Sequence, residues 1–138
     1  MDRSSMEERK EAIRNGRTTL GIELGSTRIK AVLMDEHYAP VAVGNHDWEN
    51  RYIDNIWTYT LEDIWEGVQG SYRNMAEDVK NRYGVTITTI GAIGFSAMMH
   101  GYMAFNKDGK ILVPFRTWRN TITGAASEKL TKLFEYNI

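Results

Sequence analysis

The chain has 138 residues, of which 42% are hydrophobic, and its 17 Lys and Arg against 18 Asp and Glu give a formal net charge of −1. This composition excludes gross disorder, and the near-neutral charge argues against a nucleic-acid or membrane partner held by electrostatics alone. The chain has no cysteine, no apolar run of the about 18 residues that a membrane helix needs and no signal peptide, so we expect a cytoplasmic domain without disulfides, thiol catalysis or cysteine-bound zinc.

Residues 1–17 differ from the rest of the chain and predict a helix. Ser5 and Glu8 fit a capping box, good helix formers follow them, and Gly16 would end the helix. We interpret this segment as a solvated helical extension that precedes a domain over residues 18–138.

Three short strands are predicted next. Apolar residues alternate over residues 18–24, and two further apolar runs cover residues 29–34 and 41–45. Because parallel neighbours need crossovers of a dozen or more residues, the short turns here predict an antiparallel meander.

Residues 60–83 form the clearest predicted helix, with apolar residues at three- and four-residue spacings. Thr60 is its predicted N-cap, and Gly84 would end it. The apolar, β-rich run at residues 85–95 predicts a buried central strand. Since this strand follows a helix, we expect it to run parallel to an earlier strand.

The last part of the chain predicts a hairpin and another helix. Asn-Lys-Asp-Gly at residues 106–109 separates short runs at residues 102–105 and 110–113, and a helix begins near Thr123. The order is therefore β-β-β-α-β, a hairpin and a helix. This order is typical of the start of a ribonuclease-H-like, actin-like ATPase domain, an α/β fold with a mixed sheet.

The turn between the first two predicted strands is the most informative segment. Glu23 ends one strand, Gly25, Ser26 and Thr27 form the turn, and Lys30 lies in the next strand. Gly25 leaves room for a bound group, the hydroxyls and backbone amides can converge on a phosphate, and Lys30 can supply positive charge. A carboxylate beside an anion indicates a metal ion between them, which makes Glu23 a candidate ligand. An ordinary hairpin with glycine at its corner is the alternative.

Residues 23–30, Glu-Leu-Gly-Ser-Thr-Arg-Ile-Lys, resemble the first phosphate motif of the FGGY carbohydrate kinases, sugar kinases of the actin-like ATPase superfamily. The resemblance implies ATP and Mg²⁺ as cofactors. The family usually has Asp where Glu23 stands, so contact with Mg²⁺ through water is the alternative to direct coordination.

A second candidate site follows the predicted central strand, where ligands of open α/β sheets collect. There His100 can exchange hydrogen bonds with a sugar hydroxyl, and Gly101 leaves room for a ligand or allows a positive φ. A structural histidine is the alternative. The segment is similar to the Gln-Met-His-Gly of xylulose kinases within the family, which implies that Met99 and His100 touch the sugar.

A third segment contains Trp118, Arg119 and Asn120 and resembles the Trp-Asn or Trp-Arg-Asn segment of the family. The resemblance implies that Trp118 lines the sugar pocket and that its polar neighbours reach hydroxyl groups. An aromatic face suits the apolar C–H surface of a sugar. The alternative is a core tryptophan beside a solvated arginine. Trp57 and Trp65 are interpreted as core residues.

Together the three segments imply part of an ATP-dependent kinase that transfers the γ-phosphoryl group to a sugar hydroxyl, with a ketopentose such as xylulose or ribulose favoured. The resemblance covers the opening, incomplete part of the first family domain, and the Asp that acts as base lies beyond Ile138, so we expect this chain alone to be inactive. Uncovered apolar faces lead us to expect self-association or a homodimer. A non-catalytic actin-like binding or assembly module and a ribonuclease-H-like nuclease stay open as alternatives.

Overall fold

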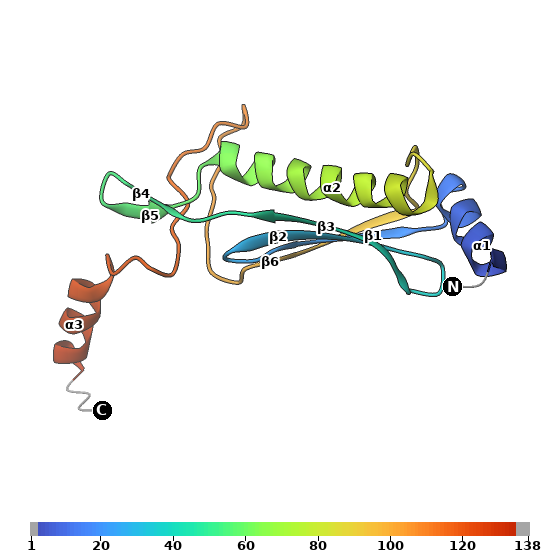
Figure 1. Ribbon diagram of the computed structural model, residues 1–138. Coiled ribbons are helices and arrows are strands. Elements are labelled where there is room, and N and C mark those ends of the chain that lie inside the picture. The colour runs from blue at the N-terminus through green and yellow to red at the C-terminus, as the bar shows by residue number, and fades with distance from the viewer. Residues whose placement is uncertain (1–2, 135–138) are drawn as a thin grey trace. The chain divides into compact units, whose positions relative to one another are not determined.

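The computed structural model describes residues 3–134 and contains two compact units (Figure 1). Unit 1 consists of Met1–Glu49 and Thr60–Met99, and unit 2 consists of Asn50–Tyr59 and His100–Ile138. Unit 1 contains the larger sheet and the long helix, whereas unit 2 contains a short hairpin and the last helix. No helix within residues 3–134 is long and apolar enough to cross a lipid bilayer.

Unit 1 is built on a four-stranded mixed sheet in the order β3-β2-β1-β6. Its strands are β1 Thr19–Leu24, β2 Arg28–Met34, β3 Pro40–Asp47 and β6 Ala92–Ala97. Strand β2 is antiparallel to both β1 and β3, whereas β6 is parallel to β1. The predicted meander is confirmed, and so is the parallel direction of the strand that follows the helix.

The predicted long helix is α2 Leu61–Tyr83, which lies along one face of the sheet against β3 and β2 (Figure 1). The Thr60 hydroxyl accepts a hydrogen bond from the backbone N–H of Asp63, and the Asp63 carboxylate accepts one from the N–H of Thr60, both at 3.1 Å. Gly84 ends the helix with a φ of 66° and donates its N–H to the carbonyl oxygen of Lys80 at 2.8 Å. Both predicted caps are confirmed.

The core of unit 1 lies between α2 and the sheet. Alternate residues of β1 and β2 are buried: Leu20, Ile22, Ile29, Ala31 and Leu33. Met75 and Val79 of α2 are both 0% exposed. Gly44 of β3 allows the closest approach of sheet and helix, because a Cβ atom at this position would overlap backbone atoms of Ser71 and Met75.

Strand β6 differs from its prediction in length and in position. It covers Ala92–Ala97 rather than residues 85–95, and it is an edge strand whose residues are all exposed. The prediction of a buried central strand is wrong because α2 packs on β3 and β2 and leaves Ile93 and Phe95 uncovered, at 55% and 68% exposure. The apolar composition of this segment therefore does not show whether a helix packs on the strand.

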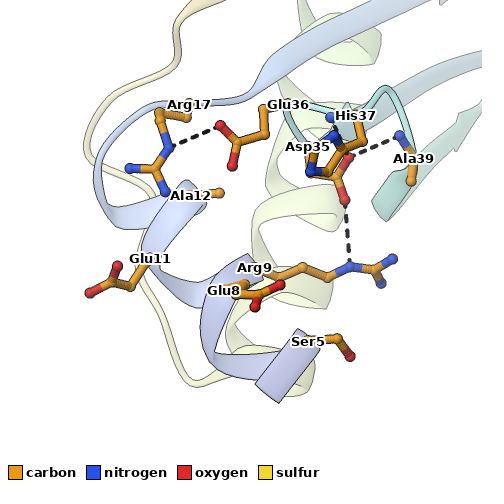
Figure 2. Close-up of a pocket in the computed structure, with 10 residues that line it drawn as sticks. All are labelled: Ser5, Glu8, Arg9, Glu11, Ala12, Arg17, Asp35, Glu36, His37 and Ala39. Carbon is orange, nitrogen blue, oxygen red and sulfur yellow. Dashed lines mark hydrogen bonds and ion pairs between the residues drawn. The ribbon is translucent and has the colours of Figure 1, made fainter. Parts of the chain in front are cut away.

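The N-terminal helix is α1 Arg3–Arg14, and it is part of unit 1. Ala12 and Ile13 are buried, at 2% and 1% exposure. Figure 2 shows Arg9 of α1 reaching the Asp35 carboxylate, with 3.5 Å between Nε and Oδ2. The interpretation of this segment as a solvated extension is wrong for its described residues, because one face of the helix is part of the core.

The predicted ends of this helix have different outcomes. Ser5 lies inside α1, so the capping box predicted at Ser5 and Glu8 is wrong. Gly16 adopts a φ of 67° directly after the helix, which confirms it as the stop. The division between residues 1–17 and residues 18–138 stays a prediction.

Unit 2 begins with a hairpin that the sequence did not predict. Strands β4 Arg51–Ile53 and β5 Ile56–Thr58 pair antiparallel through a two-residue turn. Asp54 and Asn55 in that turn have φ angles of 48° and 64°, the conformation that a tight hairpin requires of both central residues. The signal for this hairpin is the Asp-Asn pair, because three-residue strands are too short to show an alternating pattern.

The predicted hairpin around residues 106–109 is only partly present. The turn is confirmed, since the Asn106 side chain accepts hydrogen bonds from the N–H groups of Asp108 and Lys110 at 3.0 and 2.9 Å. The two predicted strands are wrong, because one isolated bridge between Phe105 and Ile111 replaces them.

The last helix is α3 Gly124–Leu133 and confirms the prediction of a helix near Thr123. The Thr123 side chain makes no capping hydrogen bond. The described residues of α3 are all exposed, including Leu130 and Leu133 at 54% and 67%.

Candidate functional site

The β1–β2 turn has the geometry of a tight loop with an accessible tip. The N–H of Gly25 donates to the carbonyl oxygen of Arg28 at 3.0 Å and closes the turn. A Cβ atom at residue 25 would come within 2.9 Å of that same oxygen, so glycine fits the turn without strain. Ser26 and Thr27 form the exposed tip. This loop offers backbone N–H groups and hydroxyls at the end of the sheet, as a phosphate requires.

Glu23 and Lys30 lie opposite each other in the β1–β2 register, directly behind the turn. Both side chains are exposed, and Ser96 of β6 is the register partner of Glu23 on its other side. The three residues therefore project from the same face of the sheet, since neighbouring residues in register share a face. One carboxylate, one ammonium and one hydroxyl meet at this point.

A cavity of about 400 Å³ lies on that face of the sheet. Its lining combines the polar residues Glu23, Lys30 and Ser96 with a floor that includes Gly21 and Gly94. These two glycines are register partners, and a Cβ atom at either would meet nothing within 4 Å. The charged pair thus borders an open concave surface within unit 1, and the turn residues themselves do not line it.

The donor set fits a magnesium–phosphate group better than a caged metal. Mg²⁺ is usually held by one or two carboxylates together with water and substrate phosphates. Within residues 3–134 no group of three or more His, Cys, Asp or Glu side chains converges in a way that could hold a metal ion by itself. Glu23 would therefore contribute one ligand, directly or through water, while phosphate oxygens completed the set.

Trp48 is a site residue that sequence reasoning missed. Its indole Nε1 donates to the carbonyl oxygen of Gly25 at 2.8 Å, and its backbone N–H donates to the carbonyl oxygen of Thr27 at 3.1 Å. Trp48 is 8% exposed, so the ring itself is packed. The register pairs Asp47 with Arg28, which brings the residue after β3 next to the β1–β2 turn. A tryptophan at the end of a third meander strand is the signal that could have revealed it.

The predicted sugar segment begins where unit 1 ends. Met99 of unit 1 is 92% exposed, and His100 of unit 2 is exposed as well. Gly101 has a φ of 150°, and a Cβ atom there would overlap the ring of Phe115. The Phe115 ring in turn lies 5.7 Å from the ring of Tyr59. The structure thus explains Gly101 by its positive φ and by its packing against Phe115. The Phe115 ring occupies the space beside Gly101 where the sequence predicted room for a ligand.

Trp118, Arg119 and Asn120 lie together with Trp57 in unit 2. Trp118 is 62% exposed, which does not fit the alternative of a core tryptophan. The Arg119 guanidinium carbon lies 5.2 Å from the centre of the Trp57 ring and 5.8 Å from that of Trp118. The Asn120 side chain makes hydrogen bonds to the backbone of Trp57. Polar and aromatic groups suited to a sugar are therefore gathered here.

The core interpretation of Trp57 and Trp65 is not supported. Trp57 is half-buried and contacts Arg119, so it belongs to the aromatic group just described. Trp65 is 56% exposed on α2. Spacing in a helix shows which residues share a face, and here Trp65 lies away from the sheet.

A further cavity of about 440 Å³ lies in unit 1 between α1 and the β2–β3 turn (Figure 2). None of the predicted site residues lines it. Four of its charged groups are paired with each other: Arg17 with Glu36 at 3.2 Å, and Asp35 with Arg9 at 3.5 Å, while two backbone N–H groups also donate to Asp35. This cavity is therefore the solvated seam where α1 meets the sheet.

Comparisons with known proteins agree with this fold. Residues 18–137 match the family model for the N-terminal domain of the FGGY family of carbohydrate kinases. A glycerol kinase from Rhizobium meliloti (strain 1021) is 24% identical over 115 residues, which cover 82% of this chain and 22% of that protein.

Solved structures show the same fold. A ligand-bound xylulose kinase from Lactobacillus acidophilus superimposes with a TM-score of 0.64 at 20% identity, over 84% of this chain and 22% of the other. A glycerol kinase from Plasmodium falciparum, solved with ADP, gives a TM-score of 0.63 at 20% identity, over 87% of this chain and 23% of the other. The expected actin-like ATPase fold is confirmed, and the chain spans less than a quarter of the length of these relatives.

Proposed function

Because the chain belongs to the FGGY family of carbohydrate kinases, we propose that it forms the phosphate turn and part of the sugar pocket of an ATP-dependent cytoplasmic sugar kinase. The observation that carries the proposal is the pairing of Glu23 with Lys30 behind the Gly25 turn. A carboxylate and an ammonium side by side at the end of a sheet suit a magnesium-bound phosphate. The reaction would move the γ-phosphoryl group of ATP to a hydroxyl of a small sugar.

The turn residues have distinct roles in this proposal. The backbone N–H groups and hydroxyls of Ser26 and Thr27 bind phosphate oxygens, and Lys30 adds positive charge. Glu23 holds Mg²⁺ directly or through water, and the ion would neutralise charge on the phosphate oxygens. Trp48 fixes the carbonyl groups of Gly25 and Thr27, so that the backbone of the turn is held in place before a phosphate binds.

The sugar is bound in unit 2 by an aromatic face and polar edges. Trp118 offers an exposed indole face to the C–H surface of the sugar, and Arg119 offers N–H donors to its hydroxyls. His100 supplies an imidazole. Met99 is its neighbour in the chain and belongs to unit 1, and its contact with the sugar stays a prediction from the resemblance. The similarity of this segment to xylulose kinases supports a ketopentose, xylulose or ribulose, as the substrate.

We expect the 138 residues to bind ligands without turning them over. In the family the base that accepts the hydroxyl proton is an Asp outside the part that this chain resembles. The exposed Ile93 and Phe95 also support self-association of the chain, because apolar side chains on an uncovered face gain by being buried.

Amide NMR spectra of the chain titrated with Mg·ATP would test the phosphate turn. We expect the largest shifts at Ser26, Thr27 and Lys30, while the 106–109 turn of unit 2, also a tight turn with exposed amides, serves as the internal control. Equal shifts at both turns, or none at the first, would contradict the assignment.

An activity assay then separates the kinase from a non-catalytic binding module. The longer protein that carries this sequence is offered ATP with xylulose, ribulose, glycerol and a hexulose in turn, and we expect the highest kcat/KM with a ketopentose. Absence of sugar-dependent ADP release with every acceptor would favour the binding module. Turnover by the 138 residues alone would contradict the proposal that the base lies elsewhere.

A further inference from the structure

The Asn120 side chain is fully engaged with backbone groups of unit 2. Its Oδ1 accepts the N–H of Trp57 at 2.8 Å, and its Nδ2 donates to the carbonyl oxygens of Trp57 at 2.8 Å and Thr117 at 2.9 Å. A primary amide has two N–H donors, and both are used here. Asn120 therefore has no donor left for a sugar hydroxyl.

These hydrogen bonds join two segments that lie 63 residues apart. The N–H of Thr117 also donates to the carbonyl oxygen of Trp57 at 3.1 Å, so strand β5 and the 117–120 loop are connected at one point by three hydrogen bonds. The bond from Asn120 to the carbonyl oxygen of Thr117 lies within the loop. Thr117 is 7% exposed, and Asn120 is half-buried. The connection is shielded enough from water for the hydrogen bonds to define the position of the loop.

Arg119 lies next to this connection and is placed by it. Its guanidinium carbon is 5.2 Å from the Trp57 ring and 5.8 Å from the Trp118 ring, both within the range of a cation–π contact. The Trp57 ring is itself supported by Tyr52, at 5.0 Å between ring centres. A guanidinium carries five N–H donors, so those that do not face the two rings are available to hydroxyl oxygens.

We propose that Asn120 is a positioning residue that fixes Trp57 and thereby orients Arg119 toward the sugar. This inference rests on the proposed function, and it replaces direct sugar contact by Asn120 with an indirect role. It also makes the β4–β5 hairpin part of the sugar-recognition apparatus, through the Trp57 side chain. An oriented arginine binds a polyol more tightly than a free one, because the side-chain entropy is lost before binding.

The test begins with the chain in the absence of sugar. Side-chain NMR signals of Arg119 Nε–H and of the Trp57 and Trp118 indoles report the stacked arrangement through ring-current shifts. We expect Asn120→Ala to move the Arg119 signal to the position of an unstacked arginine. Asn106→Ala is the matched control, because it removes two side-chain hydrogen bonds from another turn of unit 2 and should leave the Arg119 signal in place.

Binding of D-xylulose is then measured by the same signals. We expect Asn120→Ala to weaken it about tenfold and Asn106→Ala to leave it unchanged. Trp57→Leu keeps the backbone hydrogen bonds of Asn120 but removes the ring, and should weaken xylulose binding about threefold or more. This second variant keeps the proposal testable if Asn120→Ala fails to fold.

The outcomes separate the inference from the proposed function. An unchanged Arg119 signal in Asn120→Ala would overturn the positioning role, whatever the chain binds. Unchanged xylulose affinity in Trp57→Leu would overturn the path through Trp57. A third outcome is that the unaltered chain binds no sugar while Asn120→Ala still shifts the Arg119 signal to the unstacked position. The proposed function and the sugar role of Asn120 would then both be wrong. The effect of Asn120 on Arg119 would be a matter of packing alone.

Discussion

The indole Nε1 of Trp48 donates a hydrogen bond of 2.8 Å to the carbonyl oxygen of Gly25. It joins the residue that follows β3 to the turn between β1 and β2, so the end of the third meander strand is tied to the first turn. The backbone N–H of Trp48 adds a second bond at 3.1 Å to Thr27. Two carbonyl oxygens of the turn are thus fixed by Trp48, in addition to the hydrogen bond from the Gly25 N–H to the Arg28 carbonyl oxygen that closes the turn.

Trp48→Phe removes the Nε1–H donor and keeps most of the buried ring. We expect a loss of about 1–2 kcal/mol in the free energy of unfolding, because the Gly25 carbonyl loses a shielded partner. We also expect weaker Mg·ATP binding. Urea unfolding and the NMR titration measure the two effects. Trp65→Phe is the control: Trp65 is 56% exposed, so its replacement should change stability by less than about 0.5 kcal/mol.

Lys30→Met tests the charge behind the turn. Removal of an ammonium that contacts phosphate should weaken Mg·ATP binding about tenfold with little change in the free energy of unfolding, because the side chain is exposed. Lys80→Met, an exposed lysine of α2, should leave binding unchanged. Equal effects of the two variants would mean that Lys30 acts only through overall charge.

Glu23→Gln tests the metal role separately from the phosphate role. We expect a reduced dependence of ATP binding on Mg²⁺, with metal-free ATP bound as well as or better than before, since a negative charge near the phosphate is removed. Glu23→Asp restores the usual residue of the family and should keep the Mg²⁺ dependence. Titrations with and without Mg²⁺ provide the measurement, and an identical Mg²⁺ dependence in Glu23→Gln would exclude Glu23 as a ligand.

Gly44→Ala tests the closest approach of sheet and helix. A Cβ atom at this position overlaps backbone atoms of Ser71 and Met75, and backbone cannot rotate away as a side chain can. We expect a loss of about 3 kcal/mol or more, or failure to fold. Gly21→Ala is the matched control in the same sheet, because nothing lies within 4 Å of its Cβ position. Thermal unfolding of both variants gives the comparison.

Thr60→Ala tests the cap of α2. It removes the hydroxyl that accepts from the Asp63 N–H, and we expect a loss of about 1 kcal/mol in the free energy of unfolding. Thr123→Ala, at the start of α3, should cost little, since Thr123 makes no side-chain capping bond. Similar losses in the two variants would show that helix propensity rather than capping controls both sites.

The elements set by local pattern could be predicted from the sequence. The meander, the caps at Thr60 and Gly84, and the stop at Gly16 depend on alternation, on hydroxyl or glycine chemistry, and on short turns. The β1–β2 turn belongs to this class too, because all of its residues are contiguous.

The contacts that join distant segments could not be predicted. Trp48 and Gly25 are 23 residues apart, and Asn120 and Trp57 are 63 residues apart, so each contact depends on the finished arrangement of several elements. The edge position of β6 depends in the same way on where α2 packs. Apolar composition shows which residues tend to be buried. The packing of helices on the sheet decides which of these residues are buried in the folded chain.

Helix α1 shows that the region similar to the family and the buried core of unit 1 begin at different residues. The region shared with the family begins at residue 18, yet Ala12 and Ile13 lie before it and are almost completely buried. Gly16 lies against Thr89, shortly before β6, so the segment that follows α1 also contacts the segment that leads into that strand. A chain trimmed to the matched residues would lose the buried side chains of Ala12 and Ile13, and the buried interior of unit 1 therefore extends beyond the N-terminal limit of the family match.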